Sequence, residues 1–229
     1  MKETILLIDH PVGKRDDRAS RLLQEMGYGI EWCSPGRGDA LPTGESDYKA
    51  AVVYGGAESV NKLDEFAYLR QETDWIGAWA DSGRPFLGIC LGGQMLARAL
   101  GAPVSRHAEG AHEIGYVEIE PTPAANGFLD EAMHVYQWHN EGFAVPQSAE
   151  LLASGPVFRN QAFRYGGKAY GIQFHPEVSI SVMQRWMRDA AHMLEEPGAQ
   201  SKEQQLAAAA RFDAPMAAWL RNFLHDWLA

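Results

Sequence analysis

Residues 84–101, RPFLGICLGGQMLARALG, run from an apolar segment through a cysteine and two glycines into a helical pattern. The apolar segment at 85–89 predicts a buried strand, and the residues beyond the cysteine predict a helix. Gly88, Cys90 and Gly92 have the spacing of a nucleophile elbow, with cysteine in place of serine. A strand that turns sharply into a helix strains its central residue, and its neighbours must lack side chains so that the backbones can approach. The stretch therefore predicts a strand, a bend and a helix at the centre of the fold.

Cys90 has two interpretations at this point. As a nucleophile, it would lie at a helix N-terminus, where the helix dipole and free N–H groups favour thiolate over thiol. As a structural residue, it would be a small apolar side chain at the end of a buried strand, where free cysteine is common. The motif alone leaves both interpretations open.

Composition and charge narrow the class of protein. The 229 residues are enough for one sizeable domain, alone or with an appendage, and 46% hydrophobic and 22% charged residues are typical of a soluble globular protein. The net charge of -10 argues against nucleic acid as a partner. The two cysteines, Cys33 and Cys90, are too few for a disulfide scaffold, and Cys33 reads as structural. No signal peptide or membrane-spanning run is evident, so the sequence predicts a cytoplasmic protein without a membrane partner.

Strands and helices alternate over the first hundred residues. Short apolar runs, typical of strands buried on both faces, alternate with amphipathic helices, which is the pattern of βαβ units and a parallel sheet. After residue 101, short alternating segments separated by Pro, Gly and Asn predict antiparallel strands and long loops added to that sheet. The predicted fold class is α/β, with three αβα layers around a mostly parallel sheet. The predicted strands are 4–8, 30–33, 49–54, 85–90 and 168–174, and the predicted helices are 15–26, 65–81 and 180–194.

The end of the chain differs in character from the rest. It predicts a domain at residues 1–194 and a C-terminal helical extension at residues 195–229, with the segment 195–201 as a linker.

Two helices are expected in this extension. Residues 203–212 are rich in alanine, and Asp213 is predicted to cap a second helix that has Pro215 in its first turn. Apolar side chains at 216–228 form one stripe, which we expect to fold back onto the domain. If the stripe were exposed instead, it would form a homodimer or partner contact.

The chemistry of a thiol nucleophile requires a base and a group that orients the base. His175 follows the predicted strand at 168–174, and parallel strands bring their C-terminal ends to one rim of a sheet, so Cys90 and His175 are expected to meet. Glu177, beyond the rigid Pro176, can accept a hydrogen bond from Nδ1 of His175 and fix the tautomer of the ring.

Attack on a carbonyl group also requires donors for the oxyanion. The N–H of Leu91, next to the nucleophile, is one candidate. The pair Gly55-Gly56, at the end of the strand at 49–54, supplies a second candidate in the N–H of Gly56. The alternative is that the two glycines form an ordinary turn.

Together these segments resemble the class I, triad-type glutamine amidotransferases, whose glutaminase module occurs in GMP synthetase, anthranilate synthase and carbamoyl-phosphate synthetase. The resemblance covers residues 4–194 and implies a flavodoxin-like three-layer fold. The matching segments are Tyr54-Gly55-Gly56, Gly88-Ile89-Cys90-Leu91-Gly92-Gly93-Gln94 and Gln173-Phe174-His175-Pro176-Glu177.

The resemblance implies roles for particular residues. It makes Cys90, His175 and Glu177 a catalytic triad, Gly56 and Leu91 the oxyanion hole, and Gln94 a contact of the substrate glutamine.

Two further segments, 113–116 and 138–141, look like those that line the glutamine site in this family. They make His139 and Glu141 candidate substrate contacts. Glu141 stands where the family usually has Asp, and a purely structural role for His139 stays open.

The implied reaction is hydrolysis of the side-chain amide of glutamine through a γ-glutamyl thioester on Cys90. It requires no metal or other cofactor, and the sequence has no Cys/His cluster with zinc spacing. The histidines without a role are expected at the surface or in loops, and they are His10, His107, His112, His134, His192 and His225.

Three functions stay open at this stage. The first is the glutaminase of an amidotransferase, similar to the GMP synthetase glutaminase domain, which delivers ammonia to a separate acceptor enzyme because this chain has no ATP-binding loop. The second is a free-standing γ-glutamyl hydrolase or peptidase that uses the same triad. The third is a catalytically silent binding module, which the intact Cys-His-Glu set argues against.

Overall fold

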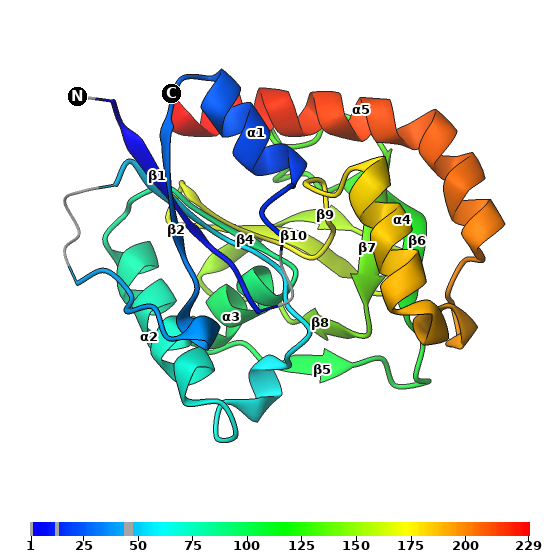
Figure 1. Ribbon diagram of the computed structural model, residues 1–229, viewed down its shortest axis with the longest axis horizontal. Helices are drawn as coiled ribbons and strands as arrows, with labels where there is room; N and C mark the ends of the chain where they lie inside the picture. Colours follow the sequence, from blue (N-terminus) through cyan, green and yellow to red (C-terminus); the bar gives the residue numbers. More distant parts are fainter. Residues whose placement is uncertain (1, 12–13, 44–47) are drawn as a thin grey trace.

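The computed structural model, which describes residues 2–11, 14–43 and 48–229, is built around a nine-stranded sheet (Figure 1). In chain order its strands are β1 (Thr4–Ile8), β2 (Gly29–Cys33), β3 (Ala50–Val53), β4 (Phe86–Ile89), β6 (Glu113–Pro121), β7 (Met133–His139), β9 (Ala149–Ser154), β10 (Asn160–Tyr165) and β11 (Ala169–Ile172). Across the sheet the order is β2-β1-β3-β4-β11-β10-β9-β6-β7. The first five strands in that order are parallel, and the remaining pairings are antiparallel. The short strands β5 (Val104–Arg106) and β8 (Glu141–Phe143) form a separate antiparallel pair.

Helices cover both faces of this sheet and give the molecule three layers. On one face lie α1 (Arg18–Glu25), α4 (Ile180–Asp189) and α5 (Lys202–Leu228), and on the other lie α2 (Ala67–Asp81) and α3 (Leu91–Ala99). Figure 1 shows α5 running alongside α1 on the side of the sheet opposite α2 and α3. Short 3-10 helices occur at Pro35–Arg37, Val60–Lys62 and Ala191–Glu195.

The central parallel strands are buried on both faces, as their uninterrupted apolar runs predict. Ile5 and Leu7 of β1 belong to the hydrophobic cluster beneath α1 and α5, whereas Leu6 and Ile8 belong to the cluster beneath α2 and α3. Each side chain is fully buried, which stabilises the fold by about 1.5–3 kcal/mol per residue. The predicted fold class, a mostly parallel three-layer α/β sheet with added antiparallel strands, is confirmed.

Helix α1 begins later than the apolar spacing predicted, at Arg18 rather than residue 15. The side chain of Asp17 accepts a hydrogen bond from the backbone N–H of Ser20, so it caps the helix. Helix α2 begins at Ala67 rather than residue 65, and Phe66, which lies within the predicted range 65–81, precedes the helix and is exposed.

The end of the chain forms one helix where two were predicted. Ser201 caps α5 through a capping box with Gln204, and the helix then continues unbroken to Leu228 with Pro215 inside it. The prediction that Asp213 caps a second helix is therefore wrong. A proline inside a helix removes one backbone hydrogen bond, and burial of the apolar face beyond it offsets that loss.

The apolar stripe of α5 packs onto its own sheet, as the preferred prediction states. Met216, Leu220 and Leu224 are fully buried, and Trp227 donates a hydrogen bond from Nε1 to the carbonyl of Lys168. A dimer through this stripe would require a surface that the folded chain already covers. The proposed boundary at residue 194 stays a prediction.

The segment before α5 is held to the sheet rather than free. The side chain of Gln200 accepts a hydrogen bond from the backbone N–H of Tyr116 at 3.0 Å and donates one to its carbonyl at 2.6 Å.

None of the helices in the described parts of the chain combines the length and apolar character that crossing a bilayer requires.

Candidate active site

Cys90 occupies the bend between β4 and α3 with an unusual backbone conformation, φ 51° and ψ -105°. Positive φ is strained for a residue with a side chain. The neighbouring glycines are required by close backbone contacts: a Cβ at Gly88 would lie 2.4 Å from the carbonyl oxygen of Gly92, and a Cβ at Gly92 would lie 2.3 Å from that of Val53. The bend therefore depends on glycine at both positions.

His175 is brought to Cys90 by the pairing of two neighbouring strands. β11 lies parallel to β4 with Ile172 opposite Ile89, and the backbone N–H of Cys90 donates to the carbonyl of Ile172 at 2.8 Å. A Cβ placed on Gly55 would lie 2.9 Å from Cε1 of His175 and 3.5 Å from Cβ of Cys90. The thiol, the imidazole and the Gly55 turn thus form one cluster at the C-terminal rim of the sheet.

The carboxylate of Glu177 lies beside the imidazole ring of His175. Its Oε1 lies 2.8 Å from Nδ1 of His175, and both side chains are almost fully buried. The ring of Trp186 meets the imidazole edge-on, with centroids 5.0 Å apart. The ring is therefore fixed by a hydrogen bond at one nitrogen and by packing against an indole.

The charges around His175 favour its protonated form. Burial lowers the pKa of His175, but the negative charges of Glu177 and Cys90 and the hydrogen bonds to both side chains outweigh burial and raise it well above the ordinary value of 6.5. The imidazole is thus able to hold a proton at neutral pH.

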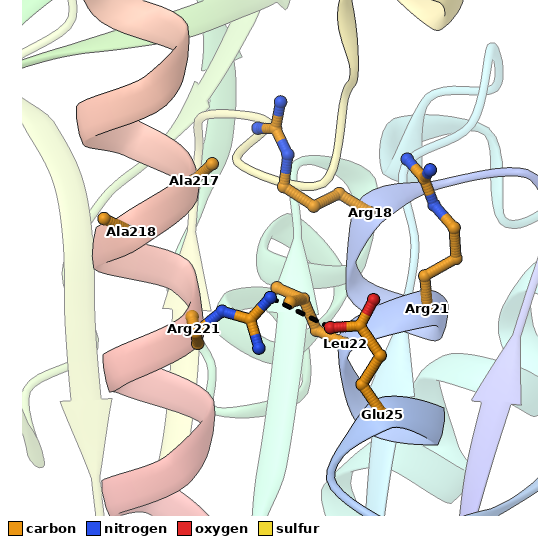
Figure 2. Close-up of a pocket in the computed structure, with 7 residues that line it drawn as sticks. All are labelled: Arg18, Arg21, Leu22, Glu25, Ala217, Ala218 and Arg221. Carbon is orange, nitrogen blue, oxygen red and sulfur yellow. Dashed lines mark hydrogen bonds and ion pairs between the residues drawn. The ribbon is translucent and has the colours of Figure 1, made fainter.

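The loop that carries Glu177 is held by Arg18 of α1. The Nη1 group of Arg18 donates to the carbonyl of Pro176 at 3.0 Å, and its backbone N–H donates to the carbonyl of Glu177 at 2.7 Å. Its Nη2 group pairs with Asp213 of α5 at 2.6 Å. Arg18 lines a cavity of about 260 Å³ between α1 and α5 (Figure 2), and neither Cys90 nor His175 is among the residues that line it.

Gly56, one of the two predicted oxyanion donors, packs against the side chain of Leu91, the other. A Cβ on Gly56 would lie 2.8 Å from Cδ2 of Leu91, the first residue of α3. Within the described parts of the chain, neither the N–H of Gly56 nor that of Leu91 donates a hydrogen bond.

Gln94 is linked to the Cys90 thiol by a second glutamine, Gln173, for which the sequence analysis gives no role. Its Nε2 group donates to the carbonyl of Glu141 at 2.9 Å and lies 3.3 Å from Oε1 of Gln173. Gln173 in turn places Nε2 3.6 Å from Sγ of Cys90. The signal for Gln173 was its place in the matching segment before His175.

His139 and Glu141 form a corner beside this site. Both ring nitrogens of His139 are occupied, Nδ1 by the carbonyl of Glu141 at 2.9 Å and Nε2 by the carboxylate of Glu113 at 3.0 Å. The Glu141 carboxylate accepts from Ser59 at 2.7 Å and from Asn61 at 3.4 Å. Both nitrogens of the His139 ring are therefore already engaged with protein groups.

His10 is buried, contrary to the prediction of a surface or loop position. It is 1% exposed and lies between the carbonyl of Gly55 and the carboxylate of Glu72. The reason is its place just after the central strand β1, whose C-terminal end lies at the same rim as Cys90. The other unassigned histidines are exposed or half-buried. No group of three or more potential metal ligands occurs within the described ranges.

Comparison with known proteins identifies the class. Residues 23–193 match the family model for glutamine amidotransferase class-I, and the chain belongs to that family, which confirms the predicted resemblance. It is 31% identical to the glutamine amidotransferase-like protein YfeJ of Salmonella typhimurium, over 70% of each chain.

Two further relatives are informative. The chain is 39% identical to one of the subunits of the glutamine-hydrolysing GMP synthase of Methanoculleus marisnigri, over 46% of this chain and 58% of that one. The crystal structure of a glutamine amidotransferase from Thermotoga maritima superposes with a TM-score of 0.90 at 29% identity, covering 100% of this chain and 99% of that one.

Proposed function

We propose that the protein is a glutaminase that hydrolyses the side-chain amide of glutamine through Cys90, His175 and Glu177. The observation that carries the proposal is the buried His175, which has Glu177 on Nδ1 and the Cys90 thiol beside the ring. This is the arrangement that a thiol nucleophile, its base and an orienting carboxylate require.

The first half of the reaction forms a thioester. The Cys90 thiolate attacks the carboxamide carbon of glutamine, and the oxygen becomes negatively charged. The N–H groups of Gly56 and Leu91 donate to that oxygen, and loss of one such donor typically costs about 3–4 kcal/mol of transition-state stabilisation. The protonated His175 gives its proton to the nitrogen as the C–N bond breaks, so that ammonia leaves.

The second half hydrolyses the thioester. His175, now neutral, removes a proton from water, which attacks the γ-glutamyl carbon and releases glutamate and the thiolate. Glu177 stabilises the imidazolium in both halves through its charge and its hydrogen bond to Nδ1.

We assign Gln94, His139 and Glu141 to the wall of the glutamine site. Gln94 and His139 both bind the backbone carbonyl of Glu141, and Gln94 also contacts Gln173 beside the sulfur. Because the ring of His139 has no free nitrogen, its part is to hold Glu141 in place.

The ammonia is proposed to pass to a separate acceptor enzyme. Support comes from the similarity to the GMP synthase of Methanoculleus marisnigri, because the matching protein is named as one subunit of that enzyme. Both cysteines are free, which fits a reducing cytoplasm.

The test is ammonia release from glutamine and from γ-glutamyl dipeptides by the purified protein, by Cys90→Ala and by Cys33→Ala. We expect glutamine turnover by the parent protein, a loss of about 10³-fold or more in Cys90→Ala, and little change in Cys33→Ala. Cys33 is a matched control because it is a second buried free thiol. Turnover of γ-glutamyl dipeptides alone would establish the hydrolase alternative, and full activity of Cys90→Ala would refute the mechanism.

A further inference from the structure

A buried charged pair lies beside the Gly55-Gly56 turn and has no part in the reaction described above. Nδ1 of His10 lies 3.1 Å from the carbonyl oxygen of Gly55, and Nε2 lies 3.3 Å from Oε1 of Glu72 on α2. The side chains of His10 and Glu72 are both fully buried. The contact with Glu72 is an ion pair rather than a well-aligned hydrogen bond, and the second carboxylate oxygen has no hydrogen-bond partner.

The sheet brings this pair to the reaction centre. Strands β1, β3, β4 and β11 are parallel neighbours in that order. Their C-terminal ends lead directly to His10, Gly55, Cys90 and His175, respectively. His10 therefore lies beside Gly55, and a Cβ placed on Gly55 would lie 2.9 Å from Cε1 of His175 and 3.5 Å from Cβ of Cys90.

The acceptor groups next to Nδ1 and Nε2 indicate which nitrogens of His10 carry a proton. A carbonyl oxygen can only accept, so Nδ1 carries a proton, and the carboxylate favours a second proton on Nε2. Burial lowers the pKa of His10, but the close contact with the Glu72 carboxylate and its charge, the carbonyl of Gly55 and the charge of Glu58 raise it by more. A buried ion pair adds little net stability because desolvation offsets the attraction. The contact of His10 with the Gly55 carbonyl is therefore considered for its effect on geometry.

The geometry in question is that of one peptide unit. The C=O of Gly55 and the N–H of Gly56 belong to the same peptide group, which is trans, and in a trans peptide the two bonds point in opposite directions. Because His10 holds the carbonyl, the N–H of Gly56 points away from His10. Two consecutive glycines have no side chains to resist rotation of this group. A rotated peptide would direct a carbonyl oxygen, not a donor, at a developing oxyanion.

We propose that His10, supported by Glu72, is a positioning residue that fixes the Gly55-Gly56 peptide so that the Gly56 N–H binds the oxyanion. The inference rests on the proposed function and adds to it a control of the oxyanion hole from the next strand of the sheet. His10 itself touches neither the substrate nor the sulfur.

Two variants of similar size separate the role of Nδ1 from that of the ring. In His10→Asn the Nδ2 donor is as many bonds from the backbone as Nδ1 of histidine, so it can still bind the Gly55 carbonyl. In His10→Gln the donor is one bond further out, where Nε2 was. Both are made together with Glu72→Gln, so that no unpaired charge stays buried, and Glu72→Gln alone is the reference.

We expect the Asn double variant to keep kcat for glutamine within about 5-fold of the reference. The Gln double variant should lose about 30-fold or more in kcat with KM changed by less than about 3-fold, because the oxyanion forms only during reaction. Equal kcat values in the two double variants would overturn the proposal.

Alkylation of Cys90 by iodoacetamide distinguishes positioning from general damage. The sulfur displaces iodide from a saturated carbon, so no oxyanion forms and the Gly56 donor is not used. Burial raises the pKa of Cys33 to about 11, so that thiol does not interfere. We expect equal alkylation rates in all variants, and a rate that falls in parallel with turnover would overturn the proposal.

Crystal structures of the two double variants test the same point without turnover. The Gly55 carbonyl should point at residue 10 in the Asn variant and be rotated or disordered in the Gln variant, and an unchanged peptide in the Gln variant would overturn the proposal. If the parent protein turns over neither glutamine nor γ-glutamyl dipeptides, the proposed function has failed, and these structures still decide whether His10 fixes the turn.

Discussion

Glu177 acts on His175 in two ways, through its charge and through the hydrogen bond to Nδ1. Glu177→Gln separates these effects, because the amide oxygen can still accept from Nδ1 but the charge is gone. Since that charge raises the pKa of His175, its removal must lower the pKa.

We therefore expect the alkaline limb of the pH profile of kcat/KM for glutamine to move to lower pH in Glu177→Gln, with a reduced maximum. The measurement is ammonia release across the pH range in which the folded protein is stable. An alkaline limb that stays in place, or that moves to higher pH, would show that Glu177 does not set the charge of the imidazole.

At the scale of elements, Arg18 joins α1, α5 and the loop at residues 175–177. Its ion pair with Asp213 is largely buried, and its other contacts are two carbonyl groups of the Glu177 loop. Arg221 lines the same cavity in Figure 2, but its ion pair with Glu25 is exposed. The two arginines therefore provide a matched comparison.

Arg18→Met should lower the free energy of unfolding by about 2–4 kcal/mol and also lower kcat, because it releases Pro176 and leaves Asp213 unpaired. Arg221→Met should cost at most about 1 kcal/mol and leave kcat unchanged. Urea unfolding and glutamine turnover measure the two effects. Similar losses in both variants would mean that the contact with Pro176 does not hold the loop.

The sequence predicts local structure better than it predicts contacts between residues that are far apart along the chain. The strand at Thr4–Ile8 has the predicted bounds, and the cysteine bend and the His175 loop could be located because each has its own glycine or proline signal. The contacts of Arg18 with Pro176 and of His10 with Gly55 could not be predicted, because periodicity gives the buried face of an element but not its partner. The single helix α5 was missed since Pro215 is a common first-turn residue and only packing shows that it lies inside a helix.

At the scale of the whole molecule, α5 shares one hydrophobic cluster with α1, α4 and the sheet. Helix and sheet are therefore expected to unfold together. Leu220 is a direct probe because its side chain is fully buried in that cluster.

Leu220→Ala should shift the entire urea unfolding curve by about 2–5 kcal/mol, with fluorescence and circular dichroism changing together. Ala218→Ser, at an exposed position on the same helix, is the control and should change stability by less than about 0.5 kcal/mol. A separate early transition of α5 would instead support an independent C-terminal unit beginning after residue 194.

The positive φ at residue 90 costs this protein stability that a glycine at the same position would not. Glycine adopts a positive φ without strain, whereas a residue with a side chain loses about 1–3 kcal/mol of folding free energy there. In a chain without a use for the thiol, replacement of Cys90 by glycine would increase stability. This chain has kept the cysteine. A side chain kept at this strained position is therefore expected to have a role of its own, and the proposed reaction gives it one.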